Sequence, residues 1–218
     1  MTAETTRVEA FSDGVFAIAI TLLILEIKIP AAGSGPLSEH PLSEQLIRQW
    51  PSYLSFLISF TFIGIMWINH HRLFTHIALS DDVLLILNLL LLLGVVVVPF
   101  PTAVLAIHLG GADQLPALIL YNSTYVFIAF FFNLLWRYAA SEKRQLLAKD
   151  VDPGSVQRIS HQYAFGPILY LGCLCLSWLS AAASLALGFA LACFFALPPH
   201  VVVSERSAAA RGAREPAG

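Results

Sequence analysis

A polar cluster stands directly before an uncharged apolar segment near the start of the sequence. The cluster holds Arg7, Phe11, Ser12 and Asp13, and the segment Gly14 to Leu25 that follows carries no charged side chain. Polar groups inside a bilayer are costly unless they are paired or wet, so this cluster at a membrane boundary indicates a functional site. Arg7 and Phe11 share a helix face, whereas Asp13 points elsewhere and needs a partner on another helix. Alternatively, Ser12 or Asp13 caps the helix N-terminus.

A second polar cluster ends the second long apolar segment of the sequence. It contains Trp67, Asn69, His70 and His71. If both clusters lie at the same side of the membrane, they meet at one depth and form hydrogen bonds between helices, each worth about 0.6–2 kcal/mol. Asn88 in the third apolar segment is a further candidate for this network.

The residues that commonly bind metals do not form a ligand set. His70 and His71 are adjacent, so on a helix they point about 100° apart and do not hold one ion as an H-x-x-x-H pair would. The cysteines, Cys173, Cys175 and Cys193, lie in apolar segments and are odd in number. We expect them to act as small hydrophobic residues, with no disulfide and no metal site.

The composition indicates a membrane protein. Of the 218 residues, 57% are hydrophobic and only 12% are charged, whereas a soluble domain is about one quarter charged. The formal net charge of −2 supplies no basic surface for nucleic acid, so no nucleic-acid partner is expected.

The hydropathy pattern predicts an all-α, polytopic membrane protein with six transmembrane helices. A spanning helix needs about 20 mostly apolar residues. The six segments are residues 9–29, 53–77, 83–108, 115–138, 163–179 and 182–203. They form one domain, 1–203, without a strong internal repeat, and residues 204–218 are expected to be a disordered tail. Loops are expected at 30–51 and 141–161, and Pro99 and Pro101 are expected to kink or break the third segment.

The distribution of Lys and Arg predicts the orientation. With six spans, ten of the 12 Lys and Arg residues fall on the side that carries both termini. Only Lys28 and Arg48 fall on the other side. Because Lys and Arg are enriched in cytoplasmic loops, both termini are expected in the cytoplasm.

The first helix offers two faces that could line a pathway. Ile18, Leu22 and Leu25 recur at helical spacing and form one stripe. The helix is apolar all round, so the pattern does not choose this stripe over the face with Ala17, Ile20 and Ile24, or over ordinary packing and lipid contact. The sequence holds no T-V-G-Y-G filter.

The two polar clusters resemble the motifs of a known family. Arg7-x-x-x-Phe11-Ser12-Asp13 on the first of six helices is similar to the hallmark of the endolysosomal potassium channel family, the transmembrane-protein-175 type. Trp67-x-Asn69-His70-His71 is similar to its companion motif. The chain is thereby identified as a prokaryotic member, with one six-helix repeat.

The resemblance implies a homotetrameric, potassium-preferring cation channel of the cytoplasmic membrane, with no enzymatic activity and no cofactor besides permeant K+ ions. It implies a central pore lined by the first helices, with a constriction at Ile18, Leu22 and Leu25 and with Thr21 as a polar neighbour. It also implies a set of residues that support the pore helix. These are Arg7, Phe11, Ser12, Asp13, Trp67, Asn69, His70 and His71.

Two other classes of membrane protein stay open at this point. A proton-coupled secondary transporter could use Asp13, His70 and His71 as a relay, although ionisable groups near the midplane are scarce. An intramembrane metalloenzyme would need more ligands than the two histidines and their neighbours offer.

Overall fold

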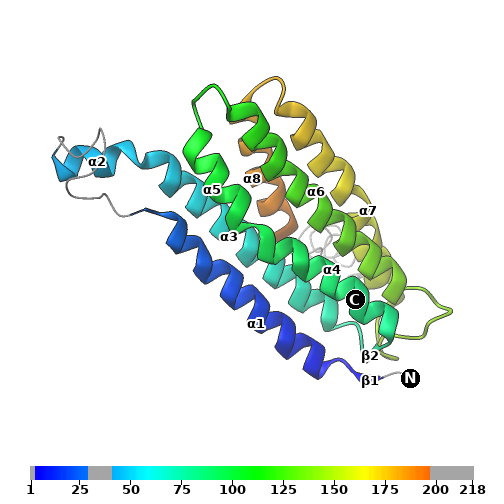
Figure 1. The fold of residues 1–218 in the computed structure, drawn as a ribbon. Helices are drawn as coiled ribbons and strands as arrows, with labels where there is room; N and C mark the ends of the chain where they lie inside the picture. Colours follow the sequence, from blue (N-terminus) through cyan, green and yellow to red (C-terminus); the bar gives the residue numbers. More distant parts are fainter. Residues whose placement is uncertain (1–2, 29–40, 197–218) are drawn as a thin grey trace, which may run out of the picture.

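The structure is a computed structural model that describes residues 3–28 and 41–196. Almost every element in these ranges is a helix, as predicted. The helices are α1 (Thr6–Leu22), η1 (Leu23–Glu26), α2 (Leu42–Arg48), α3 (Trp50–Phe74), α4 (Asp82–Val97), α5 (Pro99–His108), α6 (Gln114–Ala139), α7 (Pro153–Leu176) and α8 (Ala181–Ala196). Helix α1 and the helices from α3 to α8 lie side by side in one bundle, with α1 along one flank and α2 projecting beyond one end of the bundle (Figure 1).

A small two-stranded sheet, absent from the all-α prediction, holds the start of α1. Strand β1 (Ala3–Glu4) pairs antiparallel with β2 (Leu79–Ser80), so Glu4 lies opposite Leu79. The Thr5 hydroxyl also donates a hydrogen bond of 3.1 Å to the carbonyl oxygen of Ile77. These contacts tie the beginning of α1 to the connection between α3 and α4.

Four helical segments are long and apolar enough to cross a membrane by length and composition. They are Thr6–Glu26, Trp50–Phe74, Asp82–His108 and Gln114–Ala139, and they match the first four predicted segments within a few residues. Because α1 begins at Thr6 with Thr5 as N-cap, Ser12 and Asp13 lie inside the helix. The interpretation of either residue as a helix cap is therefore wrong.

The prolines break the third segment as predicted. Helix α4 ends at Val97 and α5 begins at Pro99. A proline has no backbone N–H and its ring crowds the preceding turn, so the regular hydrogen-bond pattern stops there.

The last two helices differ from the prediction. Helix α7 begins at Pro153, ten residues before the predicted 163, because the carboxylate of Asp152 caps it by accepting from the Ser155 N–H at 2.9 Å. The predicted loop 141–161 is therefore too long. The predicted loop 30–51 is also wrong in part, since α2 and the start of α3 lie within it.

Helix α8 has 16 residues, a length of about 24 Å at 1.5 Å per residue. The described residues end with it at Ala196. The last part of the predicted sixth segment and the predicted tail, residues 204–218, lie outside the described residues.

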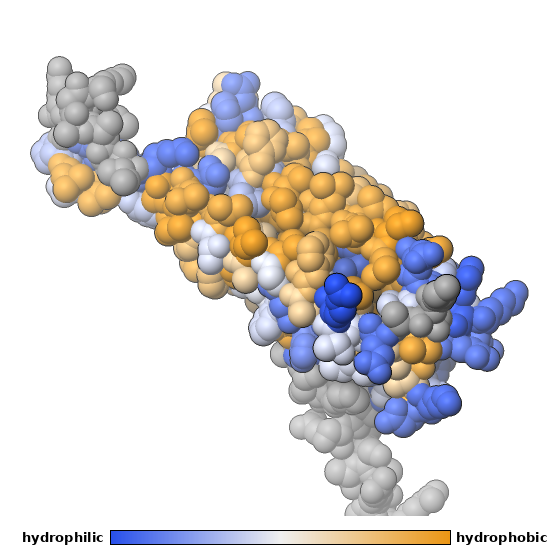
Figure 2. Space-filling model, turned by 60° about the horizontal axis from the view of Figure 1, so that its bottom comes forward, coloured by the Kyte–Doolittle hydropathy of each residue, from blue (hydrophilic) through white to orange (hydrophobic). Residues whose placement is uncertain are grey.

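The bundle surface carries an apolar band between polar ends. In Figure 2 hydrophobic side chains cover the middle of the visible face, and hydrophilic side chains gather at both ends. Helix α1 packs against α3 and α4, whereas α6 packs against α4, α5 and α7. Among the residues that the structure describes, one face of α1 is therefore left without a partner.

Candidate functional site

The outward face of α1 and η1 is exposed along its whole length. The exposed residues on this face are Arg7, Phe11, Gly14, Ile18, Thr21, Leu22 and Leu25. Ile18 is 61% exposed and Leu25 is 64% exposed, although apolar side chains of this size favour burial. The opposite face holds Ser12, Phe16, Ala19 and Leu23, which are buried.

The alternative face of α1 is in part occupied by α3. Ile20 is half-buried, and its Cδ1 lies 4.0 Å from the position that a Cβ would take at Gly64. Ala17 and Ile20 line a groove with Gly64 and Trp67. Ile24 is exposed at 53%, so this face is not uniformly covered.

Thr21 is the one residue with a hydroxyl on the outward stripe of α1. Its hydroxyl is hydrogen-bonded to the Ala17 and Ile18 carbonyl oxygens, each at 2.9 Å. This local bonding satisfies the hydroxyl hydrogen inside an apolar helix, while the hydroxyl oxygen keeps acceptor capacity.

A buried hydrogen-bond chain joins α1, α4 and α3. The Ser12 hydroxyl donates to the Val8 carbonyl oxygen at 2.8 Å and accepts from the Asn88 Nδ2 at 3.0 Å. The Asn88 Oδ1 lies 2.9 Å from the His70 Nε2. Because an amide oxygen only accepts, His70 donates here and carries its proton on Nε2. All three side chains in the chain of bonds, Ser12, Asn88 and His70, are buried.

A second contact joins α1 and α3 at a more exposed place. The Trp67 indole Nε1 donates a hydrogen bond of 2.8 Å to the Asp13 Oδ1. The Trp67 ring also stacks with the His71 ring at a centroid distance of 6.3 Å. Asp13 thus finds its partner on another helix, as the sequence predicted for this side chain.

The structure does not bring every predicted residue into these contacts. Among the described residues, no hydrogen bond or ion pair reaches the exposed side chain of Arg7, and Phe11 is 56% exposed. The Asn69 side chain is buried, yet it borders cavities between α3, α6 and α7 and lacks a hydrogen bond within the described ranges. Asp13 and His70 have separate partners, so they do not form a direct relay.

Two other buried polar clusters were missed by the sequence analysis. The Ser59 hydroxyl is hydrogen-bonded to the Thr102 hydroxyl at 2.8 Å and to the Tyr121 hydroxyl at 3.1 Å. The Asn122 Nδ2 donates to the hydroxyls of Ser177 and Ser184 at 2.8 and 2.9 Å. A polar residue alone in an apolar segment is the signal that could have indicated them, because such a residue needs a partner in the membrane.

Metal ligands do not gather anywhere in the part of the chain that the structure describes. In these ranges, no group of three or more His, Cys, Asp or Glu side chains is placed to hold an ion. The candidate site therefore consists of the exposed stripe of α1 and the two hydrogen-bonded contacts that hold this helix on α3 and α4.

The comparisons with known proteins fit this geometry. The family model described as "Endosomal/lysosomal potassium channel TMEM175" matches residues 7–99, a range that holds α1, α3 and α4. A protein named a potassium channel from Chamaesiphon minutus is 47% identical over 201 residues, which cover 89% of this chain and 95% of that relative. The chain belongs to the TMEM175 family.

Further similarity extends along most of the chain. A protein named a potassium channel from Streptomyces collinus is 42% identical over 209 residues, covering 95% of this chain and 98% of that protein. The crystal structure of a lysosomal potassium-selective channel TMEM175 homolog from Chamaesiphon minutus matches with a TM-score of 0.79 and 44% identity. That match covers 90% of this chain and 98% of the solved chain. The TMEM175 family is an ion channel family, so this protein is a membrane protein and not an enzyme.

Proposed function

We propose that this TMEM175 protein is a potassium-preferring cation channel of the cytoplasmic membrane. It works as a homotetramer in which α1 of each subunit lines a central pore, and it needs no cofactor besides the permeant ions. The observation that carries the proposal is the exposed apolar stripe of α1, because this helix packs on α3 and α4 with its other face. The preference for potassium is supported by the names of the Chamaesiphon and Streptomyces relatives.

The constriction in this proposal is built from Ile18, Leu22 and Leu25. Cyclic symmetry repeats one stripe around an axis, so each of these residues makes a ring. Rings of apolar side chains gate a pore by dewetting. Thr21 lies beside them and offers its hydroxyl oxygen to the pathway.

The polar contacts have a supporting role in this proposal. Ser12, Asp13, Trp67 and His70, together with Asn88, fix the rotation of α1 about its axis. A rotation of α1 would turn Ile18 away from the pore, so these hydrogen bonds define the constriction indirectly. Arg7, Phe11 and His71 complete the support in the assembled channel. Asn69 borders the cavities near α6 and α7, so we assign it no contact with α1.

The proposed topology has six spans in a single repeat, formed by α1 with η1, α3, α4 with α5, α6, α7 and α8. Both termini lie in the cytoplasm, since ten of the 12 Lys and Arg residues then face that side. In this division residues 1–203 form the channel domain and residues 204–218 a cytoplasmic tail.

The deciding experiment is a measurement of the reversal potential in a planar bilayer. The purified protein is reconstituted between solutions of potassium and sodium. We expect currents that reverse near the potassium equilibrium potential. A silent bilayer combined with saturable uptake driven by a pH gradient would instead support a proton-coupled transporter.

Single substitutions test the pore assignment. We expect Ile18→Asn, Leu22→Asn and Leu25→Asn to change conductance or the permeability ratio without dissociating the tetramer. Ile24→Asn is the matched control, because Ile24 is also exposed but lies on the other face of the same helical segment. Unchanged currents in all three pore variants would overturn the assignment, and a change with Ile24→Asn alone would favour the other face.

A further inference from the structure

Two adjoining cavities lie between α3 and α7. The first is a polar cleft whose lining includes Arg72, His76, Ser155, Arg158 and Gln162. The second is an apolar cavity, which also reaches α6 and α8, with a lining that includes Phe62, Tyr125, Phe132, Tyr170 and Phe195. Asn69 and Tyr163 border both cavities, so the cleft that contains the arginines adjoins the apolar cavity directly.

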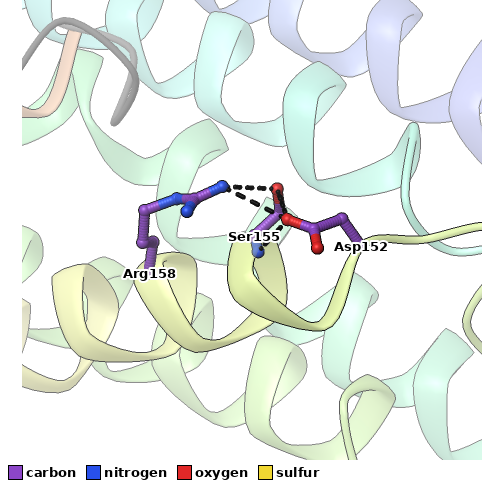
Figure 3. A network of polar contacts seen from close by, with 3 residues as sticks. All are labelled: Asp152, Ser155 and Arg158. Carbon is purple, nitrogen blue, oxygen red and sulfur yellow. Dashed lines mark hydrogen bonds and ion pairs between the residues drawn. The ribbon is translucent and has the colours of Figure 1, made fainter. Parts of the chain in front are cut away.

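The charge of the polar cleft is positive. Its lining holds the guanidinium groups of Arg72 and Arg158 and, among the described residues, no carboxylate. The Arg158 Nη2 donates to the Ser155 hydroxyl at 2.9 Å and lies 3.4 Å from the Asp152 Oδ2 (Figure 3). The Asp152 side chain is 64% exposed and belongs to the rim. Water therefore screens its attraction for Arg158.

A buried donor at these cavities lacks a partner, and an amide side chain that borders both cavities makes no hydrogen bond among the described residues. The Arg158 Nε is buried and has no hydrogen-bond partner in the described ranges. The Asn69 side chain, on a residue only 9% exposed, also has no hydrogen bond among the described residues. A buried polar group without a partner is costly, so an anionic ligand in the cleft would supply the acceptor that the Arg158 Nε lacks.

The depth of the two cavities matches one leaflet of a bilayer. Arg72 stands near the C-terminal end of α3, and Phe62 lies ten residues before it on the same helix. At 1.5 Å per residue this separation is about 15 Å, half of the roughly 30 Å hydrocarbon thickness. A headgroup at Arg72 and Arg158 would place an acyl chain along the lining that reaches Phe62.

We propose that this site binds an anionic phospholipid of the leaflet that faces the C-terminal end of α3. Arg72 and Arg158 bind the phosphate, and one acyl chain enters the apolar cavity between α3, α6 and α7. Basic pockets between transmembrane helices are suited to lipid phosphates, and guanidinium groups bind phosphate through paired, charge-assisted hydrogen bonds. The continuity with the apolar cavity favours a lipid over a free phosphate.

Binding is tested on the purified full-length protein in detergent by native mass spectrometry. The probes are dioleoyl phosphatidylglycerol, dioleoyl phosphatidylcholine and inorganic phosphate. We expect one phosphatidylglycerol per subunit, with at least tenfold weaker binding of phosphatidylcholine and no retained phosphate. Equal binding of the two lipids, or phosphate that displaces the lipid at equal concentration, would overturn the proposal. The measurement needs no ion current, so it is independent of the proposed channel function.

Variants locate the site. Arg158→Gln should weaken phosphatidylglycerol binding at least tenfold. Asp152→Asn removes the ion pair with Arg158, so this variant should bind phosphatidylglycerol as tightly as the unsubstituted protein or more tightly. Arg137→Gln is the matched control, since Arg137 lies near the end of α6 outside the cleft. Unchanged binding in Arg158→Gln with normal thermal unfolding would overturn the assignment.

A further variant tests the apolar part of the site. Ala129 lines the apolar cavity, and Ala129→Phe should weaken binding of the dioleoyl lipid more than binding of dihexanoyl phosphatidylglycerol. Equal effects on the two chain lengths would place the acyl chain elsewhere and overturn that part of the proposal.

Discussion

Asn88 on α4 donates a hydrogen bond of 3.0 Å from its Nδ2 to the Ser12 Oγ on α1. Both side chains are buried, and the bond links residues that are 76 positions apart. The other end of the same amide accepts from His70 on α3. One asparagine therefore connects three helices at a single depth, and the position of α1 depends on it.

Replacement of Asn88 by leucine should destabilise the protein. The side chain has a similar size, but Ser12 and His70 each lose a partner, and a buried group left unpaired costs about 1–3 kcal/mol. We expect a lower midpoint of thermal unfolding in detergent. Leu89→Ala is the control, because Leu89 is exposed beside Asn88. An unchanged midpoint in Asn88→Leu would show that the bonds contribute nothing to stability.

Removal of the Trp67 donor should loosen α1. Trp67→Phe keeps an aromatic ring but leaves the Asp13 carboxylate without the hydrogen bond of 2.8 Å. The expected cost is about 0.6–2 kcal/mol, with smaller currents because α1 is held less firmly. Trp178→Phe, at an exposed indole beyond the end of α7, is the matched variant. Equal effects of the two substitutions would contradict a specific role for the Trp67 bond.

The close approach of α4 and α6 at Gly94 should not tolerate a side chain. A Cβ at this position would lie 2.6 Å from the Ile128 Cγ1 and 2.9 Å from the Phe127 Cδ1. Overpacking of this kind costs about 1–3 kcal/mol, so Gly94→Ala should lower the unfolding midpoint. Gly172→Ala is the control, since a Cβ there meets nothing within 4 Å and alanine favours a helix. A higher unfolding midpoint in both Gly94→Ala and Gly172→Ala would contradict a tight contact between α4 and α6 at Gly94.

Hydropathy was sufficient to predict the first four long segments, because each is a run of apolar residues longer than a bilayer requires. It failed at α7, whose first turns are polar. Their helical state depends on the Asp152 cap and on contact with α6. A charged stretch is read as a loop when its packing partner is unknown.

The site was predictable only in part. Ser12 could be read as a cap or as a network residue, and the choice depends on where α1 begins. That boundary is set by the pairing of Glu4 with Leu79, a contact too distant in sequence for any local pattern. Similarly, Asn69 and His70 point about 100° apart on α3, so only one of them faces α1. The structure turns His70 toward Asn88 and leaves Asn69 at the cavities near α7.

Protonation of Asp81 should destabilise the protein at low pH. Burial alone would raise the pKa of this carboxyl. The Leu84 backbone N–H at 2.9 Å, the Tyr138 hydroxyl at 2.7 Å and the Arg144 charge outweigh that effect, so the pKa lies below the ordinary value of 3.8. A pKa that is lowered in the folded state adds stability at pH values above the pKa of the unfolded state. This stability is lost as the pH falls through the pKa of the folded state.

The variant Asp81→Asn removes the charge, while its Oδ1 still accepts from the Leu84 N–H as the cap of α4. Its Nδ2 takes the place of the other carboxylate oxygen and donates to the Tyr138 hydroxyl oxygen. We expect the unfolding midpoint of the unsubstituted protein to exceed that of Asp81→Asn by a constant amount between pH 7 and about pH 5. The difference should shrink below about pH 4, where the unfolded carboxyl takes up its proton first. Asp150→Asn, at an exposed position, controls for the loss of one negative charge. A difference that persists unchanged at pH 3, or that appears equally in Asp150→Asn, would show that the bonds to the Asp81 carboxylate do not stabilise the fold.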